Sequence, residues 1–337
     1  MKSLSLITFT LAALLFSGCS SKKYFEPEQT YSASNASSSY GGSIIDLSRT
    51  GGTLESGQYI GKEGIGSVSL GEGYRFINES SRYVLAGSVD GNLKVIDKKT
   101  KEAVRVVSLK IPVVSATIKN GVIAYVLNNN SFGMYQMSGS KKLMESRSET
   151  TFAIDTRAAN PMFIDNLVVM PMLDGKLIIV SIADSENAKV VYISYEKAFN
   201  NIIYLERKGN TMIAATPTKL LTLGNAGQLE HRENISEVAY DKGTIYLFTK
   251  EGKIIALNSG LDIIGESKYK FAHYTAGTVF NGRVYALEQG GSLIVMNNDL
   301  TKHKIYDVGE VDEAAFIAGT KLYKDGEIIE LSKLGYE

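Results

Sequence analysis

The chain has 337 residues, of which 44% are hydrophobic and 21% are charged, so it holds enough apolar material for a globular core. Basic and acidic residues number 36 each. That balance gives no long-range field for nucleic acid, which is not expected as a partner. The single cysteine, Cys19, excludes an intramolecular disulfide. The 32 glycines and 19 tyrosines, against 5 prolines, favour short strands joined by tight turns.

Residues 1–18 have the pattern of a secretory signal peptide. Lys2 supplies the positive start, and residues 4–16 form an apolar stretch. This stretch is shorter than the roughly 20 residues that a bilayer-spanning helix needs. We therefore exclude residues 1–18 from the expected fold.

The end of this signal, Leu15-Phe16-Ser17-Gly18-Cys19, resembles the lipobox of bacterial lipoproteins, although that family more often has Leu, Val or Ile in place of Phe16. The resemblance implies cleavage before Cys19 and acyl chains on that cysteine, and several chains on one residue give stable membrane anchoring. Ser20, rather than an aspartate, follows the cysteine, which in the enterobacterial scheme implies sorting to the outer membrane. The alternative is an ordinary signal peptide with an incidental cysteine.

Residues 20–41 are rich in serine and alanine and poor in aliphatic side chains. Such a segment buries too little apolar surface to offset the entropy lost on ordering. We therefore predict that residues 19–41 comprise the lipid-carrying cysteine and a flexible tether, and that residues 42–337 form one folded domain.

A strand–turn–strand unit recurs along this domain. In its clearest copy, an apolar strand runs to Gly87, a turn follows at Asp90-Gly91, and a second strand runs to Asp97. The turns recur 34 to 45 residues apart, at Gly91, Asn130, Gly175, Thr218, Gly252, Gly291 and Gly326. Asn130 is read as a substitute for glycine, because asparagine tolerates a left-handed backbone.

Each unit is flanked by one further strand on either side, and four strands in about 40 residues are typical of a β-propeller blade. A β-sandwich also has evenly spaced short strands, but it does not need the same turn chemistry seven times. We predict an all-β, seven-bladed β-propeller with four-stranded antiparallel blades. The last unit ends near Ser332 without a fourth strand. We expect an N-terminal strand, residues 43–48, to complete that blade and close the ring.

Residues 91–104 and 251–258 resemble the PQQ-type propeller repeat, whose consensus is approximately Asp-Gly-x-Leu-x-Ala-Leu-Asp-x-x-Thr-Gly. The tryptophan that follows this turn in the family is missing from every repeat of the chain. With the lipobox, the repeat is similar to the propeller lipoprotein of the β-barrel assembly machinery. That relative is an eight-bladed, non-enzymatic scaffold that binds periplasmic domains of the barrel-inserting protein. The resemblance implies a scaffold lipid-anchored in the outer membrane and facing the periplasm.

Enzyme chemistry is not expected, and neither is a cofactor or a metal site. A quinoprotein dehydrogenase would need a tryptophan against the quinone and commonly a vicinal cysteine pair, whereas the chain has no tryptophan and one cysteine. The three histidines are far apart in sequence and fall on expected outer strands or loops. Asp90, Asp174 and Asp325 each precede a turn glycine, which explains them without calcium.

Two connections, residues 144–161 and 194–207, are longer than the repeat requires, and insertions in repeat folds often form the binding face. Arg147, Arg157, Tyr195 and Phe199 lie in them and are of the residue types that anchor protein interfaces. We predict that these four contact a protein partner. The alternative is that Tyr195 and Phe199 simply pack between blades.

Three functions remain open at this stage. The first is a non-enzymatic lipoprotein scaffold in envelope or outer-membrane protein assembly, with a membrane contact through its lipid and a protein partner. The second is a structural part of another envelope machine, such as a flagellar or secretion apparatus. The third is an enzyme acting in the central channel of the propeller, which convergent ionisable residues at the channel mouth would favour.

Overall fold

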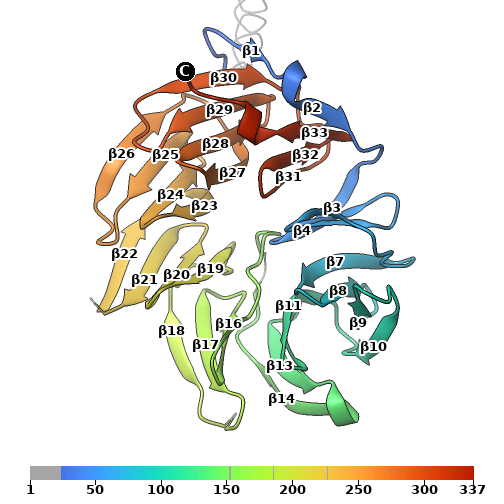
Figure 1. Ribbon diagram of the computed structural model, residues 1–337. Coiled ribbons are helices and arrows are strands. Elements are labelled where there is room, and N and C mark those ends of the chain that lie inside the picture. Colours follow the sequence, from blue (N-terminus) through green and yellow to red (C-terminus); the bar gives the residue numbers. More distant parts are fainter. Residues whose placement is uncertain (1–23, 152, 185, 226) are drawn as a thin grey trace, which may run out of the picture.

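The computed structural model describes residues 24–151, 153–184, 186–225 and 227–337, which form a ring of eight sheets (Figure 1). The predicted β-propeller with four-stranded blades is confirmed, but the predicted count of seven blades is wrong. We number the blades 1 to 8 in the order of the innermost strands β3, β7, β11, β15, β19, β23, β27 and β31. The predicted signal peptide and Cys19 lie outside the described residues.

In each blade the chain begins at the innermost strand and runs outward. Blade 1 consists of β3 (Ile44–Ser48), β4 (Gly51–Leu54), β5 (Tyr59–Gly61) and β6 (Gly64–Gly66). Blade 2 consists of β7 (Tyr74–Glu79), β8 (Tyr83–Ser88), β9 (Asn92–Asp97) and β10 (Ala103–Ser108). Blade 3 consists of β11 (Val113–Lys119), β12 (Val122–Leu127), β13 (Ser131–Gln136) and β14 (Lys141–Arg147). Blades 4 and 5 consist of β15 (Met162–Ile164), β16 (Leu167–Pro171), β17 (Lys176–Ser181) and β18 (Lys189–Tyr192); and β19 (Tyr204–Lys208), β20 (Thr211–Thr216), β21 (Lys219–Gly224) and β22 (Gly227–Arg232).

The remaining blades bring the two ends of the described chain together. Blade 6 contains β23 (Ile235–Asp241), β24 (Thr244–Thr249), β25 (Lys253–Leu257) and β26 (Ile263–Lys268). Blade 7 contains β27 (Tyr274–Phe280), β28 (Arg283–Glu288), β29 (Ser292–Asn297) and β30 (His303–Asp307). Blade 8 contains β31 (Ala315–Ala318), β32 (Lys321–Lys324) and β33 (Glu327–Glu330). The short 3-10 helices are η1 (Ser34–Ala36), η2 (Ser138–Ser140) and η3 (Leu331–Lys333). Among the described residues, no helix has the length and apolar character needed to span a bilayer.

Blade 1 is the blade that the repeat did not reveal. Its hairpin turns at Gly57, where φ is +78°, but its strands are short and rich in glycine. Close packing explains one of these glycines, because a Cβ on Gly51 would lie 2.1 Å from the Ile60 carbonyl oxygen and 2.4 Å from the Phe76 ring. Residues 43–48 were expected to complete the last blade, but residues 44–48 instead form β3, the innermost strand of blade 1.

The ring is closed by an N-terminal strand, as expected, but by an earlier one. Strand β2 (Ser37–Ser39) pairs antiparallel with β33 and supplies the fourth strand of blade 8. Strand β1 (Tyr31–Ser32) pairs parallel with β30 and adds a fifth strand to blade 7. The prediction of a flexible tether is therefore wrong for residues 31–39, which are part of the propeller. We call residues 24–39 the strap.

The strap is packed as well as hydrogen-bonded. Ala33 and Ala36, each 4% exposed, belong to the apolar cluster between blades 7 and 8 that also contains Leu331. The Phe25 ring meets the Tyr269 ring edge to face, with centroids 5.8 Å apart. Burial of apolar side chains provides the free energy that offsets the ordering of a serine-rich segment.

Asn130 does more than substitute for a turn glycine. It is fully buried with φ +62°, its Nδ2 donates to the Glu149 carbonyl oxygen at 2.6 Å, and its Oδ1 accepts from the Leu173 amide at 2.9 Å. The side chain therefore ties blade 3 to blade 4 and to the connection between them.

Replacing Asn130 with glycine is expected to destabilise the protein by about 2–3 kcal/mol, because two buried hydrogen bonds are lost although the backbone conformation is permitted. Urea unfolding followed by circular dichroism measures this. Asn120→Gly is the matched control, since Asn120 also has positive φ but is exposed, and it should change stability by less than about 0.5 kcal/mol. Equal stabilities of the two variants would show that the side-chain hydrogen bonds of Asn130 do not stabilise the fold.

Candidate protein-binding surface

The two long connections reach the same face of the propeller. At the end of each outer strand the chain returns to the hairpin turn of its own blade, as where Ile193 N donates to the Gly175 carbonyl at 2.8 Å and Val308 N to that of Gly291 at 2.9 Å. We call the face of the propeller that carries these hairpin turns and connections the connection face. It carries residues 148–161, between β14 and β15, and residues 193–203, between β18 and β19.

The first of these connections enters the central channel (Figure 1). The Arg157 guanidinium donates to the Ser236 carbonyl of blade 6. Asn160 accepts from the Ala116 amide of blade 3 at 3.2 Å and contacts Thr50 of blade 1 at 3.4 Å. The segment therefore links blades on different sides of the channel.

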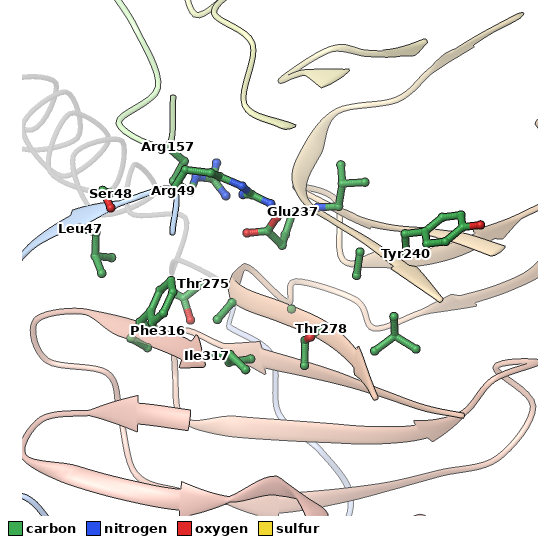
Figure 2. Close-up of a pocket in the computed structure, with 16 residues that line it drawn as sticks. Leu47, Ser48, Arg49, Arg157, Glu237, Tyr240, Thr275, Thr278, Phe316 and Ile317 are labelled. Atoms are coloured by element: carbon green, nitrogen blue, oxygen red, sulfur yellow. Dashed lines mark hydrogen bonds and ion pairs between the residues drawn. The ribbon is translucent and has the colours of Figure 1, made fainter. Parts of the chain in front are cut away.

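Ionisable residues do converge in the channel, which was the feature expected of an enzyme, but they form ion pairs with one another. Arg49 lies 2.6 Å from the Glu237 carboxylate (Figure 2), and Arg157 lies 2.7 Å from the Asp155 carboxylate. The adjacent cavity measures about 240 Å³. A second cavity, lined by Arg49, Asn160 and Glu206, measures about 510 Å³ and falls within the range of about 300–1,000 Å³ for small-molecule sites. The Arg49–Glu237 ion pair joins blade 1 to blade 6, whereas the Arg157–Asp155 ion pair lies within the inserted segment. That segment is bound to blade 6 through the hydrogen bond from Arg157 to the Ser236 carbonyl.

The pKa of the Asp155 carboxyl reflects its contacts with Arg157. Burial alone would raise the pKa of the Asp155 carboxyl, but hydrogen bonds from Arg157 and its charge outweigh burial and hold that pKa below its ordinary value. The ionised pair is thus favoured in the folded state. Of the four predicted partner-binding residues, Arg157 is the one that the structure places inside the channel, with its guanidinium already bonded.

The two long connections also pack against each other. Phe199 N donates to the Ala153 carbonyl at 2.9 Å, and the Asn201 side chain exchanges hydrogen bonds with the backbone of Asp155 at 2.7 and 2.9 Å. Because one connection is fastened in the channel, it gives the other a fixed support. A surface held on such a support loses little entropy on binding.

Aromatic side chains are exposed on this support. Tyr195 is 76% exposed and Phe199 is 55% exposed. Tyr195 stacks on Tyr192 of β18, with ring centroids 5.0 Å apart and an interplanar angle of 17°. The alternative that Tyr195 and Phe199 pack between blades is therefore not what the structure shows. We call Tyr192, Tyr195 and Phe199 the aromatic surface.

A charged cluster lines a cavity of about 470 Å³ beside these rings. Lys176 Nζ lies 2.8 Å from the Glu149 carboxylate and 2.9 Å from that of Asp174, and 5.4 Å from the centre of the Tyr192 ring. Burial lowers the pKa of Lys176, but hydrogen bonds to Glu149 and Asp174 outweigh it and raise the pKa. Mixed charges next to exposed rings suit a protein surface with its own polar groups.

Part of this surface was predicted from the sequence. Arg147 is exposed at the start of the connection, where it donates to the Asn129 carbonyl and the Thr150 hydroxyl. Tyr192 was missed, although Val190 and Tyr192 alternate along β18 and are 47% and 41% exposed. Apolar side chains at alternate positions of an outer strand are the signal in the sequence that could have indicated an interaction site. Asp174, read only as a turn residue, also belongs to the charged cluster.

The histidines are not brought together with acidic residues as a metal centre. Across residues 24–337, leaving aside 152, 185 and 226, no group of three or more histidine, cysteine or acidic side chains is placed to hold a metal ion. His273 and His303 are exposed, whereas His231 is half-buried and its burial lowers its pKa.

Two relatives are similar to the chain over nearly its whole length, whereas no family model matches it. It is 28% identical to the plasminogen-binding protein PgbB of Helicobacter pylori strain J99, over 97% of this chain and 69% of that protein. It is 27% identical to PgbB of H. pylori strain ATCC 700392, over 97% of this chain and 68% of that protein.

Solved structures show the same architecture. BamB from Moraxella catarrhalis matches with a TM-score of 0.69 and 14% identity, over 87% of this chain and 97% of that one. The C-terminal WD40 domain of Sif2 matches with a TM-score of 0.64 and 11% identity, over 87% and 98%. The resemblance to the propeller lipoprotein of the β-barrel assembly machinery is thus confirmed at the level of the fold.

Proposed function

We propose that the protein is a non-enzymatic scaffold, anchored in the outer membrane by a lipid on Cys19, that binds a protein partner in the periplasm during outer-membrane protein assembly. The observation that carries the proposal is the aromatic surface, which is exposed on a rigid support on the connection face of blades 4 and 5. The lipobox-like sequence around Cys19 and the fold shared with BamB support the anchoring and the setting.

The aromatic surface has the features of an interface centre. Tyrosine side chains supply a large contact area at low entropic cost, and such anchors dominate binding energy. The charged cluster around Lys176 would provide the polar border of the contact. Because Arg157 is fastened in the channel, its substitution would report on folding and not on binding alone.

The double variant Tyr195→Ser with Phe199→Ser should weaken partner binding by about 30-fold or more, as expected for two anchors worth at least 1 kcal/mol each. Affinity purification from cross-linked envelopes identifies the partner, and titration with the purified partner measures the change. Val104→Ser with Val106→Ser is the matched control, since these β10 valines are 44% and 50% exposed on blade 2. Unchanged affinity of the tyrosine–phenylalanine variant would refute the proposed surface.

A second candidate function is plasminogen binding, which the names of the two Helicobacter relatives state for those proteins. Similarity over 97% of this chain favours it. A plasminogen-binding protein must reach the outside of the cell, whereas an assembly scaffold faces the periplasm. Saturable binding of plasminogen, with digestion of the protein by protease added to intact cells, would favour this candidate over the scaffold.

A further inference from the structure

The strap fixes where the chain leaves the propeller on its N-terminal side. Pairing of β1 with β30 and of β2 with β33 holds residues 31–39 against blades 7 and 8. Lys304 Nζ lies 4.5 Å from the centre of the Tyr31 ring. The Phe25–Tyr269 contact holds the start of the strap against blades 6 and 7. Tyr24 is thus placed at the outer rim of these two blades and not near the channel.

Little chain remains between this point and the anchoring residue. Cys19 is five residues from Tyr24, and five peptide units span at most about 18 Å. A compact domain of this length has a diameter of about 50 Å, from the scaling of its radius of gyration. The rim of blades 6 and 7 therefore stays near the anchor, whereas the opposite rim can lie much farther away.

We propose that the rim of blades 6 and 7 is the surface of the propeller that faces the lipid bilayer. This inference rests on the proposed lipid anchor at Cys19 and adds an orientation to it. Blade 3 lies across the ring from blade 7, so β14 is at the far edge from β1 and β30 (Figure 1). The aromatic surface, on blades 4 and 5, is displaced from the membrane side and stays open to a protein partner.

The side chains at this rim suit a headgroup region. Tyr24 is 64% exposed and Phe271 is 37% exposed, and Lys270 Nζ lies 5.1 Å from the centre of the Phe271 ring. Aromatic and lysine side chains favour the membrane–water interface. Glu26 and Glu28 lie on the same strap, so this rim carries charges of both signs. We therefore ascribe the orientation to the short connection between Cys19 and Tyr24 and not to net charge.

The test uses the full lipoprotein in vesicles that contain lipids with nitroxide-labelled headgroups. With the Cys19 sulfur bonded to lipid, Lys270→Cys and Lys141→Cys each add one free thiol for a bimane label. Both positions are exposed, one beside the strap and one at the start of β14. We expect quenching of the label at position 270 to exceed that at position 141 at least twofold. Equal or stronger quenching at position 141 would overturn the orientation.

Two further variants separate this inference from the anchor itself. Insertion of about 20 glycine and serine residues between Lys23 and Tyr24 allows the propeller to move tens of ångströms from the anchor, and should remove the difference between the two labels. A difference that survives the insertion would refute the role of the short connection. Cys19→Ala should abolish vesicle binding; full binding of this variant would instead refute the lipid anchor, and with it the proposed setting.

Discussion

Deletion of the strap is expected to lower the free energy of unfolding by about 5 kcal/mol, which is a large part of the 5–15 kcal/mol typical of a folded domain. Blade 8 would keep three strands, and the apolar cluster between blades 7 and 8, which contains Ile329 and Leu331, would lose Ala33 and Ala36. The ring would then be held closed by side-chain packing alone. Urea unfolding of residues 40–337 beside residues 24–337 measures the effect.

A shorter deletion, of residues 24–30, is the matched control. It removes the Phe25–Tyr269 contact but keeps β1, η1 and β2, so the loss should be about 1 kcal/mol, as for one aromatic pair. If both deletions unfold at the same urea concentration as the longer chain, closure of the ring by the N-terminal strand does not stabilise the fold.

The second large effect is expected for Arg157→Met. The Asp155 carboxylate, with 15% of its side chain exposed, would lose its cation, and the Ser236 carbonyl would lose a donor. Removal of one partner of a largely buried ion pair costs about 3–5 kcal/mol. Arg147→Met, at an exposed arginine shortly before the same connection, should cost less than about 1 kcal/mol. Equal unfolding midpoints for these two variants would contradict the role of Arg157 in the channel.

The same pair predicts a dependence on pH. Since the pKa of Asp155 is lower in the folded state than in the unfolded state, its contribution is complete above the ordinary carboxyl value of about 3.9 and is lost as the pH falls through the folded pKa. The stability difference between the parent protein and Arg157→Met should therefore shrink as the pH is lowered from 7 into this range. Unfolding curves at a series of pH values measure it, and a difference that grows on acidification would contradict the assignment.

Local turn chemistry allowed most of the fold to be predicted. Gly91, Gly175, Gly252, Gly291 and Gly326 all have positive φ in the structure, so each hairpin could be recognised from its own residues. Blade 1 was missed although its hairpin also turns at a glycine with positive φ, Gly57, because its short, glycine-rich strands carry little of the apolar pattern seen in the other blades. The strap was missed as well, since its composition predicts disorder and only pairing with β30 and β33, far away in sequence, orders it.

The candidate site was predictable to a similar extent. The lengths of the two connections indicated the correct region, and Tyr195 and Phe199 are exposed there. Arg157 has the same residue type as an interface anchor, but its environment is the channel, and that depends on blade 6, far along the chain. Asn130 and Asp174 were explained by their turns alone, whereas their side chains bond to the neighbouring connections.

Site-specific photocrosslinking in living cells tests the central claim most directly. Benzoylphenylalanine at position 195, on the aromatic surface, is compared with the same group at position 106, on the outer strand of blade 2. The proposed function predicts a discrete crosslinked product with one envelope protein from position 195 and none from position 106. The same products from both positions, or none from position 195, would contradict a partner-binding surface on blades 4 and 5.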